Sequence, residues 1–270
     1  QRTSQKVCLR ADISVQQSPC KKGLSAAKRR IPGFMSNSAV ARNGLSVCGL
    51  ELERGERLLF RGLAFEAPPG TLVRLAGANG TGKTSLLRLL TGLMVPDAGE
   101  ILYKGESITK LREDFHRDLV YIGHMNGVKD DLSARENVRI AARLGNLIVT
   151  DSQINEALGA VGLTDFTEHT TGELSQGQRR RVALARLFVS EMKPVWILDE
   201  PFTALDVQSV ANLSDAVARH VRAGGIVIYT THQECAVDVP EEKKLTVDVS
   251  AFAPKRKKKA QACLGGGDHV

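Results

Sequence analysis

The 270-residue sequence lacks two features that would each define a class of protein. Its five cysteines form no C-x-x-C pair and are odd in number, which argues against a disulfide framework and favours a reducing compartment. No stretch approaches the roughly 18 uninterrupted apolar residues of a membrane-spanning helix, so work at a membrane would depend on a partner that spans it. With 42% apolar residues, the chain can bury the core of one large domain.

Acidic residues are almost missing from both ends of the chain. Residues 1–40 hold eight Lys and Arg against one acid, residues 254–270 hold five against one, and 24 basic and 28 acidic residues remain for 41–253. The net charge of +7 therefore belongs to the tails, while the body carries about −4. We expect no nucleic-acid partner.

Both ends are expected to lie outside the folded domain, which we place at residues 41–250. Residues 1–40 are rich in Arg, Lys and Ser, and two interpretations remain open for them: an organelle transit segment, or an over-extended reading frame, since residue 1 is Gln and not Met. Residues 251–270 consist largely of Ala, Lys and Gly, and we expect a disordered basic tail.

Residues 77–84 match the pattern G-x-x-x-x-G-K-[ST] and are called the P-loop below. An apolar run precedes them and leucines at helical spacing follow, which predicts a strand, a loop and a helix. The glycines let backbone N–H groups converge on an anion at the helix N-terminus. We therefore expect a nucleoside triphosphate with Mg²⁺, the Lys83 ammonium on its β- and γ-phosphates and the Thr84 hydroxyl on the metal. The expected nucleotide-binding residues are Gly77, Ala78, Asn79, Gly80, Thr81, Gly82, Lys83, Thr84 and Ser85.

The order of the remaining elements predicts an α/β fold. Two continuous apolar strands at 195–198 and 226–229 flank a helix at 207–221, which indicates a mainly parallel sheet covered on both faces. Residues 132–190 are expected to be mostly helical, and Ser133 with Glu136 forms a capping box. Short strand-like runs separated by glycine predict an N-terminal antiparallel sheet at 45–65, with further strands at 100–103 and 119–123.

Two carboxylates, Asp199 and Glu200, follow the apolar strand at 195–198, in a Walker B pattern. The C-terminal edge of a parallel sheet is the usual side for ligands. Asp199 should hold Mg²⁺ together with Thr84, and Glu200 should polarise the attacking water. Without the P-loop, a solvated acidic pair would be the simpler interpretation.

Residues 174–178, Leu-Ser-Gln-Gly-Gln, precede the basic helix 179–186. Ser175 and Gln178 form a capping box, which begins a helix whose N-terminus offers a second anion site. One nucleotide would not satisfy both sites if they lie on different subdomains. The expected solution is a head-to-tail homodimer in which each serine faces the γ-phosphate bound by its partner.

These motifs, in this order, resemble the ATP-binding-cassette ATPases. Residues 174–178 resemble the signature of that family, Thr203–Asp206 the D-loop and Thr231–His232 the switch histidine. The resemblance implies the P-loop NTPase fold with a helical signature subdomain, ATP and Mg²⁺ as ligands, and ATP hydrolysis. It also implies that His232 contacts the γ-phosphate. The nucleotide-binding site is then completed by Ser175, Gly177, Gln178 and Asp206.

Within the family, residues from about 43 to 250 resemble the CcmA family, the ATPase subunits of cytochrome c maturation haem exporters. The resemblance rests on Tyr121–His124, Gly127–Lys129, 179–187, 196–206 and 224–233. It implies CcmB/CcmC-like integral membrane partners and peripheral attachment to the cytoplasmic face of a bacterial inner membrane, or to the matrix side of an organelle inner membrane. It further implies that 124–135 is the face that receives the membrane subunits.

Three positions depart from the usual cassette pattern. His124 stands where most cassettes have the Q-loop glutamine, and CcmA-like sequences resemble this chain in having a histidine there. His124 is a candidate for contact with the metal and the attacking water. Arg54 stands where an aromatic residue usually stacks on adenine, and its guanidinium plane offers a substitute. Gln176 replaces the first signature glycine.

Other functions are compatible with parts of this pattern. An exporter of another substrate, or an assembly-scaffold ATPase of the iron–sulfur type with soluble partners, would carry the same motifs. A chromosome- or repair-type cassette would need a long coiled coil between the P-loop and the signature, and the 92 residues from Lys83 to Ser175 are too few. A P-loop kinase has no use for the signature or for His232.

Overall fold

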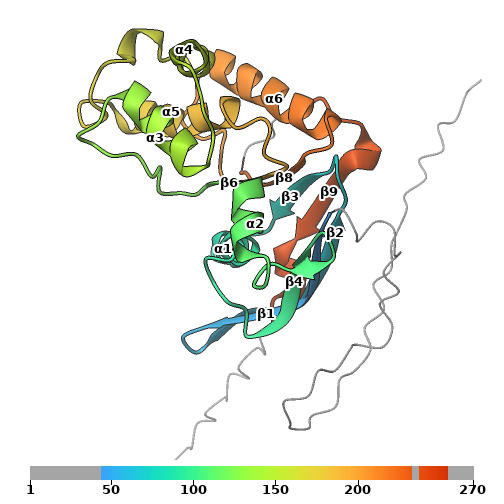
Figure 1. Ribbon diagram of the computed structural model, residues 1–270. Coiled ribbons are helices and arrows are strands. Elements are labelled where there is room, and N and C mark those ends of the chain that lie inside the picture. The colour runs from blue at the N-terminus through green and yellow to red at the C-terminus, as the bar shows by residue number, and fades with distance from the viewer. Residues whose placement is uncertain (1–43, 233–236, 255–270) are drawn as a thin grey trace, which may run out of the picture. The chain divides into compact units, whose positions relative to one another are not determined.

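The computed structural model describes residues 44–232 and 237–254, so residues 1–40 and most of the expected basic tail lie outside the described residues. The described part contains two β-sheets and the helices that pack on them (Figure 1). The first is parallel throughout, and its strand order is β6 (Leu119–Ile122), β7 (Val195–Asp199), β8 (Ile226–Thr230), β3 (Leu72–Ala76) and β9 (Lys244–Asp248). The second is antiparallel, in the order β2 (Arg57–Ala67), β1 (Leu45–Arg54), β4 (Ala98–Tyr103) and β5 (Glu106–Ser107).

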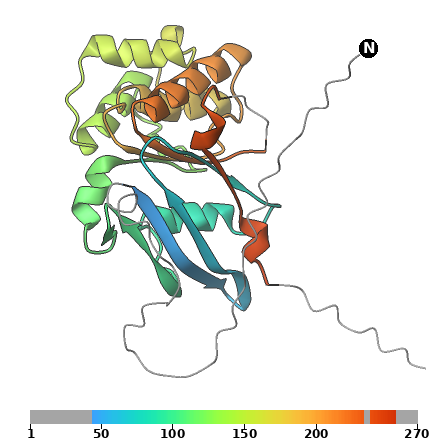
Figure 2. The same cartoon turned by 90° about the vertical axis from the view of Figure 1, so that its right-hand side faces the viewer.

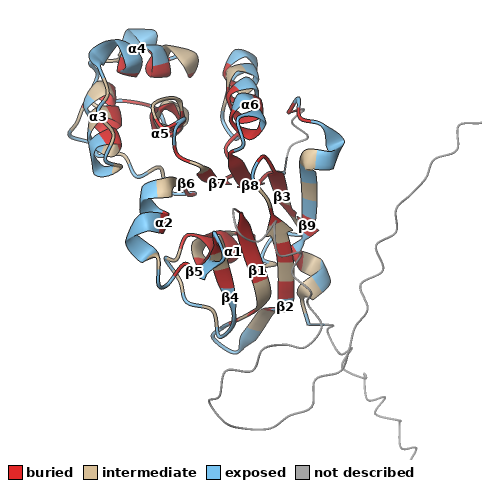
Figure 3. Ribbon diagram, turned by 45° about the vertical axis from the view of Figure 1, so that its right-hand side comes forward, coloured by how far each residue is buried: buried red, intermediate tan, exposed pale blue. Residues whose placement is uncertain are grey.

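The central strands of the parallel sheet are buried on both faces, as their continuous apolar sequences predict. Every residue of β7 and β8 is buried (Figure 3). Trp196 and Leu198 of β7 pack into one hydrophobic core, and Val195 and Ile197 pack into the other. Because side chains alternate along a strand, an apolar residue at every position is what a doubly covered sheet requires.

Helices cover one face of the parallel sheet, and the antiparallel sheet, with α1 (Lys83–Leu90) and Phe115 of the short helix at 112–118, covers the other (Figure 2). The helical core contains side chains of α3 (Ala134–Leu144), α4 (Asp151–Ala160), α5 (Gln176–Phe188) and α6 (Val207–Arg222). On the opposite face, leucines of α1 pack with β1 and β2. The described residues also form three 3₁₀ turns: η1 (Thr164–Phe166), η2 (Glu241–Lys243) and η3 (Val249–Phe252).

The prediction of an α/β fold with a parallel core sheet and an N-terminal antiparallel sheet is confirmed, and so are the helices within 132–190 and the Ser133–Glu136 capping box. The expected strand breaks at Gly49 and Gly62 were wrong, whereas Gly55 does lie in the turn between β1 and β2. Gly49 and Gly62 lie inside β1 and β2 with φ of 61° and 72°, and register shifts between Val47 and Leu50 and between Leu50 and Leu52 absorb the distortion. A bulge lets a strand continue through a residue with positive φ.

The sequence analysis did not predict α2 (Arg112–Asp118), the short strand β5 or the edge strand β9. Residues 251 and 252, assigned to a disordered tail, belong to η3. Among the described residues, no helix is both long enough and apolar enough to cross a membrane.

Candidate nucleotide-binding site

The P-loop connects β3 to α1, as predicted, and its glycines adopt conformations that suit few other residues. Gly77 has φ of 136°, and a β-carbon there would lie 2.8 Å from Ser250 Oγ and 2.9 Å from Thr81 Oγ1. Gly82, with φ of 100°, is the N-cap of α1. No side chain of the described residues caps this helix. The first N–H groups of α1 therefore remain open to an external acceptor such as a phosphate oxygen.

Lys83 is held inside the P-loop. Its ammonium donates to the carbonyl oxygens of Gly77 at 2.6 Å and Ala78 at 3.1 Å, and the residue is only 8% exposed. The Thr81 hydroxyl also donates to the Ala78 carbonyl, at 2.8 Å. A phosphate at this loop would meet a positive charge that is already positioned, and the ammonium would exchange neutral carbonyl acceptors for charged oxygens, which form stronger hydrogen bonds.

A pocket of about 610 Å³ opens in front of the P-loop. This volume is in the range of small-molecule binding sites. Four residues from other segments line it with the P-loop and α1: Arg54, Leu59, Glu200 and His232. The P-loop side contributes Asn79, Gly80, Gly82, Lys83, Thr84 and Ser85. The structure thus brings together residues that are separated by up to about 180 positions in the sequence.

The carboxylate of Asp199 is buried at the end of β7, with 3% exposure. Its Oδ1 accepts a hydrogen bond of 2.7 Å from the Thr230 hydroxyl, and its Oδ2 is buried with no hydrogen-bond partner among the described residues. An unpaired buried carboxylate oxygen is costly unless it meets a cation. Oxygen is the ligand that Mg²⁺ prefers, so Asp199 fits the expected magnesium ligand.

Glu200 follows in a left-handed conformation, with φ of 50°. Its N–H donates to the same Thr230 hydroxyl at 2.9 Å, and its Oε1 lies 3.2 Å from His232 Nε2. Non-glycine residues in this conformation are uncommon and often functional. The turn after β7 therefore sends Asp199 inward and Glu200 into the pocket beside His232.

Two positioning residues were missed by the sequence analysis. Thr230 links the carboxylate of Asp199 to the backbone N–H of Glu200, because its register partner across the sheet is Asp199. Arg180 of α5 is buried and donates to three carbonyl oxygens, those of Gly123, Asp199 and Glu200, at 2.7, 2.5 and 3.2 Å. It ties the ends of β6 and β7 together, and burial lowers its pKa. The basic run 179–181 was the available signal, but it does not distinguish the buried arginine from its partly exposed neighbours.

The signature residues do not line this pocket. Ser175 is exposed and caps α5: its Oγ accepts from Gln178 N at 3.2 Å, and Gln178 Oε1 accepts from Ser175 N at 2.9 Å, so the predicted capping box is confirmed. A β-carbon at Gly177 would lie 3.5 Å from the carbonyl oxygen of Ala204. In one chain, the signature therefore meets the D-loop and not the nucleotide pocket.

Asp206 and His124 also lie outside the pocket lining. Asp206 is the N-cap of α6, accepts from Ser209 N at 2.8 Å and pairs with Arg181 at 3.0 Å. The hydrogen bonds from Ser209, together with the charge of Arg181, hold the pKa of Asp206 below its usual value. His124 is exposed two residues beyond β6.

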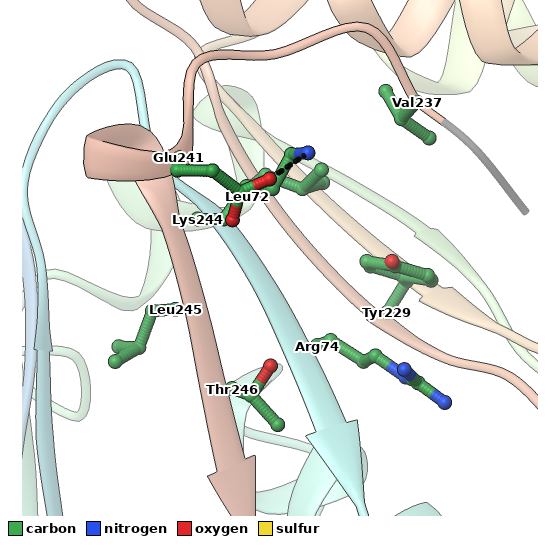
Figure 4. A pocket seen from close by; sticks show the side chains of 8 residues that line it. All are labelled: Leu72, Arg74, Tyr229, Val237, Glu241, Lys244, Leu245 and Thr246. Carbon is green, nitrogen blue, oxygen red and sulfur yellow. Dashed lines mark hydrogen bonds and ion pairs between the residues drawn. The ribbon is translucent and has the colours of Figure 1, made fainter. Parts of the chain in front are cut away.

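A further pocket of about 240 Å³ lies over β3, β8 and β9 (Figure 4). Arg74 and Tyr229 project into it from neighbouring strands, and Lys244 pairs there with Glu241 at 2.6 Å. It contains none of the predicted site residues.

Comparison with known proteins agrees with this geometry. The family model for ABC transporters matches residues 60–203. Cytochrome c biogenesis ATP-binding export proteins CcmA are 48% identical over 201 residues in Vibrio vulnificus and 50% identical over 190 residues in Nitrosomonas europaea. The matches cover 74% and 70% of this chain, and 98% and 89% of those proteins.

Solved structures give the same result for the fold. An ABC transporter ATP-binding protein from Pyrococcus furiosus superposes with a TM-score of 0.66 at 26% identity, over 78% of this chain and all of the other. The chain therefore belongs to the ATP-binding-cassette transporter family, as an ATPase subunit, and within it to the CcmA family of cytochrome c biogenesis ATP-binding export proteins.

Proposed function

We propose that this chain hydrolyses ATP as the peripheral subunit of a membrane complex for cytochrome c maturation, and that ATP-driven dimerisation is coupled to release of haem or of a haem-carrying chaperone. The single observation that carries the ATPase part is the pocket that sets Lys83 and Thr84 opposite Glu200 and His232. The link to cytochrome c rests on the names of relatives that match most of their own length.

The proposed chemistry is an in-line attack of water on the γ-phosphate. The water oxygen forms a bond to phosphorus, the bond from phosphorus to the β–γ bridging oxygen breaks, and ADP leaves with that electron pair. The Glu200 carboxylate accepts the proton of the water, and His232, 3.2 Å from it, holds the γ-phosphate. Thr84 and Asp199 would hold Mg²⁺, which neutralises charge that develops on the phosphates.

The proposed active form is a homodimer. Ser175, Gly177 and Gln178 belong to a helix N-terminus that is outside the pocket of its own chain, and each would complete the ATP site of the other chain. Asp206 would contribute from the D-loop, and Arg54 would stack on the base. His124 would contact the attacking water only after a rearrangement, since the structure has it exposed and outside the pocket lining.

Attachment to the membrane is proposed to occur through integral subunits of the CcmB/CcmC type, which dock against residues 124–135. Lys129 and other charges of this loop are exposed, and Asp130 pairs with Arg179 of α5 at 3.3 Å. The complex would lie on the cytoplasmic face of a bacterial inner membrane, or on the matrix side of an organelle inner membrane.

The test is Glu200→Gln in the complete complex. Loss of the base should lower turnover by about 10²- to 10⁴-fold, while ATP binding persists and a trapped dimer elutes early in size-exclusion chromatography. Haem-stained gels should then show no c-type cytochromes. Glu106→Gln removes an exposed glutamate of β5 and serves as the control. Hydrolysis by Glu200→Gln at the wild-type rate would remove Glu200 as the base.

A further inference from the structure

The pocket over β3, β8 and β9 is separate from the nucleotide pocket, with which it shares no lining residue (Figure 4). It is called the Arg74 pocket below. Its volume of about 240 Å³ is smaller than that of most drug-sized ligand sites, so it suits a small organic group. The residues of its lining that matter here are Leu72, Arg74, Tyr229, Glu241, Lys244 and Thr246.

Arg74 occupies a position where the fold favours an apolar residue. Its strand, β3, lies between β8 and β9 inside the parallel sheet. Leu72 packs into the helical core, and Val73 and Leu75 pack into the core on the opposite face. Because side chains alternate along a strand, Arg74 lies on the same face as Leu72. A partly buried guanidinium at such a position loses hydration, which is unfavourable unless an acceptor compensates for it.

The Arg74 side chain has no such acceptor among the described residues. Its Nε is buried without a hydrogen-bond partner, and the one ion pair within the pocket lining joins Lys244 to Glu241 at 2.6 Å (Figure 4). Two positive charges and one negative charge in the lining leave one positive charge, which is that of Arg74. The pocket therefore offers an unused set of N–H donors with a single charge to balance.

The surroundings of Arg74 indicate which anion fits. Its register partners are Tyr229 on β8 and Thr246 on β9, so a phenol ring and a hydroxyl flank the guanidinium. A carboxylate matches the planar fork of an arginine with two parallel hydrogen bonds, and the Thr246 hydroxyl can donate a further one. A phosphate dianion would exceed the charge of the lining and would meet the Glu241 carboxylate there.

We propose that the Arg74 pocket binds a small monocarboxylic acid, whose carboxylate pairs with Arg74 and whose apolar body lies against Leu72 and Tyr229. The inference goes beyond the proposed function and does not depend on it. Such a ligand would sit on β3, which leads into the P-loop, and on β8, which leads to His232, without contact with the nucleotide pocket. Arg74 is a binding residue in this proposal and takes no part in hydrolysis.

The experiment measures binding of benzoate to the full chain by saturation-transfer NMR, with benzamide as the neutral probe of the same shape. A saturating non-hydrolysable ATP analogue with Mg²⁺ keeps benzoate out of the P-loop. Benzoate should bind more tightly than benzamide by about 10- to 100-fold, the usual gain from hydrogen bonds to a charged group. Addition of the analogue should leave this preference unchanged, because the two pockets share no lining residue.

Variants locate the site. Arg74→Met keeps an apolar stem and should abolish the preference for benzoate, while Arg74→Lys keeps the charge without the fork and should retain part of it. Arg112→Met removes an exposed arginine outside the pocket and should behave as wild type. Arg74→Met should unfold at no lower a temperature than the wild type, since no partner of Arg74 is lost. If it does not fold, Thr246→Val on the exposed strand β9 should still weaken benzoate binding severalfold.

Three results would overturn the proposal. The first is no binding of benzoate, or equal affinity for benzoate and benzamide. The second is a preference for benzoate that persists unchanged in Arg74→Met, or in both Arg74→Lys and Thr246→Val. The third is loss of benzoate binding when the ATP analogue is added, which would assign the anion site to the P-loop.

Discussion

The helices α1 and α5 both begin at a segment where an anion is expected, but their N-termini are built differently. Gly82 begins α1 and offers no side chain, so the first N–H groups of that helix have no cap within the described chain. Ser175 begins α5, and a complete capping box closes it. The first helix needs a ligand to satisfy its N–H groups, whereas the second is satisfied by its own sequence.

The difference assigns different tasks to the two helices. The open end of α1 lies in a pocket with Lys83, Thr84 and Glu200 of the same chain. The Ser175 hydroxyl accepts a hydrogen bond from Gln178 N, which leaves its own hydrogen free to donate outward. A helix end that is stable without a ligand suits a surface that meets its ligand only when two chains associate.

The largest expected effect comes from mixing two inactive variants. Lys83→Ala removes the cation at the open helix end, and Ser175→Arg blocks the capped one, so each should abolish turnover in its own homodimer. An equal mixture should regain activity, because one of the two sites in a mixed dimer combines the intact P-loop of one chain with the intact Ser175 of the other. The measurement is ATPase activity against the concentration of the mixture.

The mixing experiment has a clear contrary result. If the two helix ends serve one site within a single chain, the mixture stays inactive at every concentration. Wild-type activity that is independent of concentration, in a protein that stays monomeric with ATP, would likewise contradict the shared site.

A smaller effect separates capping from phosphate contact at Ser175. Ser175→Ala should lower the free energy of unfolding by about 1 kcal/mol, and Ser175→Gly by only a few tenths, since glycine is a tolerable N-cap. Both remove the hydroxyl, so both should lower turnover by the same factor, about 10²-fold for a lost donor. Urea unfolding and ATPase assays are compared on both variants. If turnover instead changes in parallel with stability, so that Ser175→Gly is nearly as active as the wild type, Ser175 acts only as an N-cap and does not contact the phosphate.

The sequence was sufficient for the parts of this site whose geometry is local. The P-loop turn, the capping boxes at Ser133 and Ser175, and the carboxylates after β7 each depend on residues within a few positions of one another. The resemblance to a family singled out His232 as a contact for the γ-phosphate, and the structure places its Nε2 3.2 Å from Glu200 Oε1.

Contacts between distant segments were not predictable in the same way. Thr230 reaches Asp199 and Glu200 only because β7 and β8 are adjacent in register, and the sequence states neither the strand order nor the register. Arg180 and Arg186 are two of four arginines on one helix, and only packing shows that one is fully engaged and the other is not. The sequence analysis assigned Asp206 only to the D-loop motif and did not predict that it is the N-cap of α6.

The smallest expected effect concerns a third helix N-terminus, that of α6, which a carboxylate caps. The hydrogen bond from Ser209 N and the charge of Arg181 hold the pKa of Asp206 below its usual value of 3.8. A lowered pKa means that the unfolded chain binds the proton more readily, so the stabilisation is complete above pH 3.8 and is lost as the pH falls through the lower folded-state value.

Asp206→Asn keeps a good N-cap and removes the charge, so at neutral pH it should cost only what an exposed ion pair contributes, about 0.2–1 kcal/mol. The difference in unfolding free energy between the wild type and Asp206→Asn should be constant from neutral pH down to about pH 5 and should shrink below 3.8. Urea unfolding across that range provides the measurement, with Asp215→Asn as the matched change on the exposed face of α6. A difference that stays constant down to the lowest pH at which the protein folds would mean that the charge of Asp206 does not stabilise the helix, and that its capping oxygen alone matters, as the hydroxyl does at Ser175.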